Sequence, residues 1–115
     1  MSTVRAPDKR TACVSLLMLA FVAGLGGVAS SAGDTHRIVM KAVDYEPKTI
    51  TARVGDTVEW VNEDIVAHTA TAKDRTWDVN ILPQRSGRMV IKTAGTISYF
   101  CRYHPNMKGE IAVAP

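Results

Sequence analysis

Short segments in which apolar and polar residues alternate constrain the fold of this chain more than any other feature. The clearest segments are 38–42, 50–54, 57–61, 69–72, 89–91, 97–101 and 111–113. Alternation with a period of two residues is typical of half-buried β-strands. Residues 73–87 follow no regular pattern, and no segment has the period of a long helix. About seven or eight short strands separated by turns predict an all-β fold, a Greek-key antiparallel β-sandwich or barrel.

The first 32 residues differ in composition from the rest. Three basic residues come first, an apolar run follows over residues 12–29, and the small residues Ser30-Ser31-Ala32 end the segment. That order is typical of a secretory signal peptide, and we expect cleavage after Ala32. An uncleaved anchor is the alternative, although the run is shorter than the roughly 20 residues of a spanning helix. We expect a signal peptide at 1–32, one domain at 33–115 and a periplasmic location.

The net charge of the domain argues against a nucleic-acid partner. The chain has 14 Lys and Arg residues and 11 Asp and Glu residues. Three of these bases and one acid precede residue 33, which leaves eleven bases and ten acids, a net charge of +1. The remaining bases are scattered singly, as on an ordinary solvated surface. We expect no nucleic-acid partner, no membrane attachment after cleavage, and a monomer.

The domain retains one cysteine, Cys101, because Cys13 belongs to the signal segment. A single thiol cannot form an intrachain disulfide in an oxidising compartment. Taken alone, Cys101 is as well explained by a buried, inert core position as by a function. Its sequence neighbours decide between these interpretations.

Three potential metal ligands are spaced three residues apart in the loop between the last two predicted strands. They are Cys101, His104 and Met107. Cys101 continues the inward face of its strand, and Pro105 stiffens the turn that follows, so the three side chains can meet at one point. Singly, a histidine is more often structural and a methionine more often fills core space. The spacing within one loop favours a shared metal site.

A thiolate, an imidazole and a thioether select copper over hard cations. Two histidines and one cysteine in a plane, with a weak axial methionine, form the blue-copper arrangement. His68 is well placed to be the second histidine, since it follows the loop after the predicted strand that contains Trp60. His36 is the competitor, but it lies in a terminus that we expect to be mobile. The predicted site is one type 1 copper ion bound by His68, Cys101, His104 and Met107.

Two motifs resemble those of the cupredoxins, the blue copper proteins, and within them the amicyanin-like branch of the plastocyanin family. The segment VGDTVEWVN at 54–62 resembles the motif before the first histidine ligand. The pattern Tyr99-x-Cys101-x-x-His104-Pro105-x-Met107, followed by Gly109, resembles the C-terminal ligand loop. Its short interval between histidine and methionine is the amicyanin form. The resemblance extends from about His36 to Val113.

The resemblance implies an electron carrier that cycles between Cu(II) and Cu(I) and is not an enzyme. It implies weak docking of redox proteins near His104, among them an amine dehydrogenase and a c-type cytochrome. The rival interpretation is a periplasmic copper chaperone or storage protein. A multicopper oxidase fits less well, because such enzymes have histidines on both sides of the cysteine, whereas Phe100 and Arg102 flank Cys101 here. A Cys-His hydrolase and a zinc site also fit less well, since Cys101 is expected to point inward and methionine is not a usual zinc ligand.

The sequence departs from the family pattern at two places beside the ligands. Thr69 follows His68, where amicyanin has an asparagine that braces the ligand loops. A threonine hydroxyl can replace that brace in part. Arg102-Tyr103 stands between the cysteine and the histidine, where Thr-Pro or Ser-Pro is common. We expect Arg102 to place positive charge near the copper, which raises the reduction potential or attracts an acidic partner.

Overall fold

The structure is a computed structural model that describes residues 33–115, so the predicted signal segment lies outside the described residues. Nine β-strands and no helix form within this range, and no helix there is long and apolar enough to cross a membrane. The strands are β1 (Thr35–Met40), β2 (Tyr45–Glu46), β3 (Thr49–Arg53), β4 (Thr57–Asn62), β5 (His68–Ala72), β6 (Asp78–Ile81), β7 (Ser86–Val90), β8 (Gly95–Phe100) and β9 (Lys108–Ala114).

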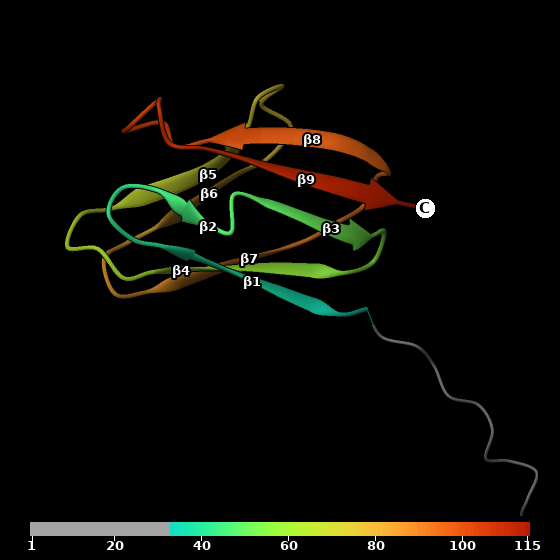
Figure 1. Ribbon diagram of the computed structural model, residues 1–115, viewed down its shortest axis with the longest axis horizontal. Helices are drawn as coiled ribbons and strands as arrows, with labels where there is room; N and C mark the ends of the chain where they lie inside the picture. Colours follow the sequence, from blue (N-terminus) through green and yellow to red (C-terminus); the bar gives the residue numbers. More distant parts are fainter. Residues whose placement is uncertain (1–32) are drawn as a thin grey trace, which may run out of the picture. The chain divides into compact units, whose positions relative to one another are not determined.

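The strands form two sheets packed face to face (Figure 1). One sheet has the order β2-β1-β4-β7 and the other the order β3-β9-β8-β5-β6. The predicted all-β sandwich is confirmed. Two neighbouring pairs, β1 with β4 and β3 with β9, are parallel, and all other pairs are antiparallel. Both sheets are therefore mixed, which alternation along single strands does not reveal.

Aromatic side chains from both sheets fill the centre of the sandwich. Trp60 and Tyr45 are fully buried, and Tyr99 is almost so. The Tyr99 ring meets the other two rings edge to face, with centroids 5.5 Å from Trp60 and 4.7 Å from Tyr45. Such edge-to-face pairs add to the stabilisation from burial alone. The indole N–H of Trp60 donates to the Tyr99 hydroxyl at 3.3 Å.

Three local expectations differ from the structure. The alternation 38–42 ends at Met40, because Ala42 and Val43 adopt positive φ angles of 53° and 57° in a turn. Val54 is 42% exposed, since β3 ends before it and Gly55 turns the chain with φ of 98°. The region 73–87, which has no pattern in the sequence, contains β6 and the start of β7.

Candidate metal centre

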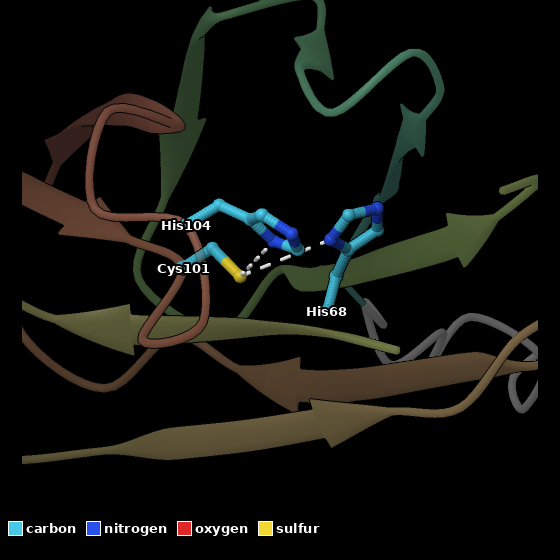
Figure 2. A group of neighbouring side chains, drawn as sticks. All are labelled: His68, Cys101 and His104. Carbon is cyan, nitrogen blue, oxygen red and sulfur yellow. Dashed lines mark hydrogen bonds between the residues drawn. The ribbon is translucent and has the colours of Figure 1, made fainter. Parts of the chain in front are cut away.

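Three of the four predicted ligands converge at one end of the sandwich. The metal-binding atoms of His68, Cys101 and His104 all lie within 4.8 Å of one another. Cys101 Sγ is 3.8 Å from His68 Nδ1 and 3.7 Å from His104 Nδ1. Figure 2 shows Cys101 and His104 on one loop, with both imidazole rings turned toward the sulfur, and His68 begins β5, the neighbour of β8 in the same sheet. The imidazole rings are 5.1 Å apart in an edge-to-face arrangement.

Strand register explains why residues so distant in sequence meet. β5 and β8 are antiparallel, with Thr71 opposite Phe100. His68, the first residue of β5, therefore lies at the same end of the sheet as the loop that follows β8. Successive side chains of a strand point to opposite faces, so Cys101, two residues after Tyr99, points into the sandwich as Tyr99 does. The sheet thus delivers a thiol and an imidazole to one point without any long flexible loop.

The spacing of these atoms fits a bound metal. With bonds of about 2.3 Å to thiolate sulfur and about 2.0 Å to imidazole nitrogen, ligands in a trigonal plane place sulfur and nitrogen about 3.7 Å apart. The separations of 3.8 and 3.7 Å in the structure agree with this value. Cys101 and His68 are fully buried and His104 is half-buried. Two nitrogens and one soft sulfur in this plane form the donor set of type 1 copper.

The loop that carries Cys101 and His104 is closed by its own backbone. The His104 N–H donates to the Cys101 carbonyl at 3.2 Å, and the Met107 N–H donates to the His104 carbonyl at 2.8 Å. The Cys101 N–H donates in turn to the Met107 carbonyl at 3.0 Å. The Met107 side chain is buried in the core cluster that contains Cys101. Its place in the loop is as expected, and its role as the axial ligand stays a prediction.

Asp64 orients the His68 ring. The Asp64 carboxylate is 2.7 Å from His68 Nε2, so the N–H is on that nitrogen and Nδ1 is free to bind a metal. It also accepts hydrogen bonds from the Ala42 and Val43 amides at 2.8 and 2.9 Å. Burial acts to raise the pKa of Asp64, but its hydrogen bonds with Val43, His68 and Ala42 hold it below the ordinary value. Sequence reasoning missed this residue, although an acid four residues before a ligand histidine was a usable signal.

Thr69 braces the two ligand-bearing segments, as the sequence suggested that a threonine could. Its backbone N–H points at Cys101 Sγ at 3.3 Å. Its hydroxyl oxygen accepts a hydrogen bond from the Arg102 N–H at 2.8 Å. Its carbonyl accepts a hydrogen bond of 2.5 Å from the Tyr45 hydroxyl. One fully buried threonine therefore connects β5 to the cysteine, to the following peptide and to the opposite sheet.

The expectation for Arg102 needs revision. Its guanidinium donates to both carboxylate oxygens of Asp78, from Nε at 3.0 Å and from Nη2 at 3.1 Å. This bidentate pair compensates much of the positive charge that the sequence placed beside the copper. The hydrogen bonds from Arg102, and to a smaller extent from Thr71, lower the pKa of Asp78. The Arg102–Asp78 pair therefore stays charged at neutral pH.

The competing histidine, His36, does not reach the site. It lies at the start of β1, opposite Val58, and its Nε2 is 2.8 Å from the Asp56 carboxylate. His68 lies beyond the other end of β4, after Asn62. The choice of His68 over His36 agrees with this placement. The expectation that His36 lies in a mobile terminus was wrong, because His36 is paired with β4 as part of β1.

Comparison with known proteins places the chain in a family. The Cupredoxin-like domain family matches residues 11–113. The amicyanin of Paracoccus versutus is 26% identical over 86 residues, which cover 70% of this chain and 65% of that protein, so the chain spans less than two thirds of this relative. The plastocyanin of Scenedesmus fuscus is 35% identical over 86 residues, covering 63% of this chain and 88% of the plastocyanin.

Solved structures agree with the sequence matches. A reduced Cu(I) form of an amicyanin variant at pH 4 superimposes with a TM-score of 0.63 and 26% identity, covering 76% of this chain and 87% of that chain. A copper-containing nitrite reductase from Thermus scotoductus SA-01 superimposes with a TM-score of 0.66 and 26% identity, but the match covers 77% of this chain and only 24% of the reductase. The chain belongs to the cupredoxin-like domain family, and its His68, Cys101 and His104 are positioned as a type 1 copper site.

Proposed function

We propose that residues 33–115 are the mature form of a periplasmic, mononuclear blue-copper protein that carries single electrons between redox partners. In this proposal the signal peptide at 1–32 is removed, and His68, Cys101, His104 and Met107 bind the copper. Copper supplies the one-electron couple between Cu(II) and Cu(I). The observation that carries the proposal is the convergence of His68, Cys101 and His104 within 4.8 Å on a rigid β-scaffold.

The surrounding residues suit electron transfer because they resist rearrangement. Cys101 Sγ is held by the Thr69 amide, and the His68 ring is held by Asp64. A ligand set that moves little between two oxidation states keeps the reorganisation energy of each electron transfer low. Both Cys101 and His68 are fully buried, which leaves the sulfur inaccessible to a substrate and argues against a hydrolase.

His104 is the route by which electrons enter and leave. It is the half-buried member of the set, and it lines a surface hollow of about 330 Å³ whose other lining residues include the apolar Val43 and Pro105 and the charged Asp44 and Lys48. Ile65 and Val66, in the loop before His68, are exposed apolar residues. The same loop carries Asp64, which accepts a hydrogen bond from the Val43 amide. A redox partner docks at this end of the sandwich over less than about 1,200 Å², as transient electron-transfer complexes do.

A groove beside the ligand loop favours an acidic partner. It has a volume of about 620 Å³ and runs over β8 and β9 to Pro105. Four of its lining side chains are basic and one is acidic, namely Lys48, Lys73, Arg75, Lys108 and Glu110. Lys48 also has an ion pair with Asp44 at 3.2 Å. The remaining positive charge would attract a negatively charged surface and raise the rate of encounter.

A copper chaperone or storage protein is the second candidate, and the methionines weigh against it. Proteins that pass Cu(I) between partners offer exposed sulfur ligands. In the described part of the chain, Met40 is fully buried in β1, Met89 is half-buried against the core and Met107 is buried. None of the three is displayed for exchange.

The test is to compare redox cycling with copper release in the purified 33–115 protein. A carrier undergoes repeated oxidation and reduction with its copper content unchanged, and it loses Cu(I) slowly to a competing chelator. Rapid and complete transfer of Cu(I) to the chelator, with little electron exchange with a small redox mediator, would favour the chaperone. Failure of the wild-type protein to bind copper would exclude both functions.

A further inference from the structure

A closed ring of hydrogen bonds joins the ligand loop to the β5–β6 hairpin. The Arg102 N–H donates to the Thr69 hydroxyl at 2.8 Å, and the Thr69 and Thr71 hydroxyl oxygens are 2.9 Å apart. The Thr71 hydroxyl donates to the Asp78 carboxylate at 2.5 Å. The Arg102 guanidinium donates to the same carboxylate at 3.0 and 3.1 Å. The ring thus begins and ends on Arg102, the residue after Cys101.

The number of protons fixes the direction of every bond in this ring. A hydroxyl group has one hydrogen, and an ionised carboxylate only accepts. The Thr71 hydrogen points at Asp78, so the bond between the two threonines uses the Thr69 hydrogen. Each hydroxyl therefore accepts one bond and donates the next, and the chain of donors ends on a negative charge. Bonds aligned in one direction polarise and strengthen one another.

The ring acts on one peptide unit, the one between Cys101 and Arg102. Its N–H donates to Thr69, and its carbonyl accepts a bond of 3.2 Å from the His104 N–H. Both polar groups of this peptide are thereby fixed. Because the orientation of this peptide sets the direction of the preceding Cα–Cβ bond, it also sets the position of Cys101 Sγ relative to the Thr69 amide, 3.3 Å away.

We propose that Asp78, on the edge strand β6, is a positioning residue for the copper site, acting through Thr71 and Thr69 on the peptide that follows Cys101. This proposal rests on the proposed function. Asp78 lies opposite Thr71 in the β5–β6 register, so its carboxylate is placed by strand pairing. Thr69 and Thr71 are buried to 0% and 1% exposure, and without an acceptor at position 78 their hydroxyls lose the terminal member of the ring.

A second arginine–carboxylate pair in the protein provides a matched control. Arg88 donates to Glu59 Oε2 from Nε at 3.3 Å and from Nη2 at 3.2 Å. The two residues lie opposite each other on the paired strands β4 and β7 of the other sheet. Exposed pairs of this kind contribute little to stability. Loss of Glu59 therefore reports what the loss of a surface ion pair does when no buried hydroxyl depends on it.

The experiment compares Asp78→Ala, Thr71→Val, Thr71→Ser and the double variant Asp78→Ala/Thr71→Val with Glu59→Ala as control. The first readout is hydrogen exchange of the Arg102 amide in the copper-free protein, which tests the ring even if copper binding fails. The second is the position of the thiolate-to-copper absorption band after loading with Cu(II). Asp78→Ala changes an exposed side chain, so the fold is expected to persist, and circular dichroism checks this.

We expect Asp78→Ala and Thr71→Val each to speed exchange of the Arg102 amide by roughly tenfold, the loss of about one hydrogen bond. The double variant should exchange no faster than the more affected single variant, because both changes interrupt one ring. Asp78→Ala and Thr71→Val should each shift the absorption band, whereas Thr71→Ser and Glu59→Ala should change neither the exchange rate of the Arg102 amide nor the position of the band. Multiplicative effects in the double variant, or unchanged exchange and band position in both single variants, would overturn the proposal.

Discussion

Removal of one buried hydroxyl, by the change Tyr45→Phe, tests how the two sheets are joined beside the metal site. The Tyr45 hydroxyl is fully buried and donates to the Thr69 carbonyl in the opposite sheet. Burial is the main cause that raises the pKa of Tyr45 far above its ordinary value, so the group remains a neutral donor throughout the working pH range. Phenylalanine retains the ring packing, with the Tyr99 centroid at 4.7 Å, and removes only the donor.

The expected loss follows from leaving a buried carbonyl without this partner. Such a change costs about 1–3 kcal/mol of unfolding free energy. For a domain of this size, about 1 kcal/mol corresponds to a shift of roughly 4–8 °C in Tm. Tyr103→Phe is the matched control, because the Tyr103 ring is 48% exposed and its hydroxyl donates at 3.3 Å to Asn80 at the surface. That change should alter the unfolding free energy by less than about 0.5 kcal/mol.

Urea unfolding of the copper-free 33–115 protein, followed by tryptophan fluorescence, measures both variants without any contribution from metal binding. The reasoning predicts a clear fall in the midpoint for Tyr45→Phe and almost none for Tyr103→Phe, with equal slopes. Equal midpoints for Tyr45→Phe and the wild type would refute the claim that this hydrogen bond ties the sheets together. A larger effect of Tyr103→Phe would reverse the assigned importance of the two hydroxyls.

Three further changes test other parts of the structure. A Cβ atom at Gly109 would lie 2.7 Å from Cε1 of the buried Tyr99 ring. Gly109→Ala should therefore lower the unfolding free energy by about 1–3 kcal/mol, and an unchanged urea midpoint would contradict this. Hydrogen bonds from His36 and two backbone amides lower the pKa of Asp56 to about 2. The wild type should therefore be more stable than Asp56→Asn by a constant amount above about pH 4, and this difference in unfolding free energy should disappear between about pH 4 and 2. A difference that does not depend on pH would contradict the prediction. Lys108→Glu should slow electron transfer to an acidic partner and flatten its salt dependence, as measured by stopped-flow kinetics; faster transfer would argue for a basic partner.

The sequence predicts the strands best where one face is buried and the other is not. In β4 every second residue is buried, and Val58 and Trp60 were recognisable as its inward face. β6 has only four residues, with Val79 and Ile81 as its apolar positions, between turns rich in polar residues, and so it was not recognised. Its identity as a strand depends on pairing with β5, which is a contact between segments and not a property of either.

The same distinction applies to the metal site. Cys101 and His104 were identifiable because their relation is local, three residues apart in one loop. His68 required a choice between two histidines, and the sequence favoured His68 because it follows the loop after the strand that contains Trp60; the strand order agrees with that choice. Asp78 had no visible signal, since its connection to the Cys101–Arg102 peptide passes through two hydroxyls on a neighbouring strand. The charge of Arg102 was readable from sequence, but the carboxylate that compensates it was not.

The most direct measurement is the absorption spectrum of the purified 33–115 protein after loading with Cu(II). A buried thiolate bonded to Cu(II) in the plane of two imidazoles should give an intense band at roughly 600 nm, with one copper ion bound per chain. The band should disappear in Cys101→Ser and persist in His36→Ala. A colourless protein, or a band that survives the loss of the Cys101 sulfur, would contradict the assignment of this site to type 1 copper.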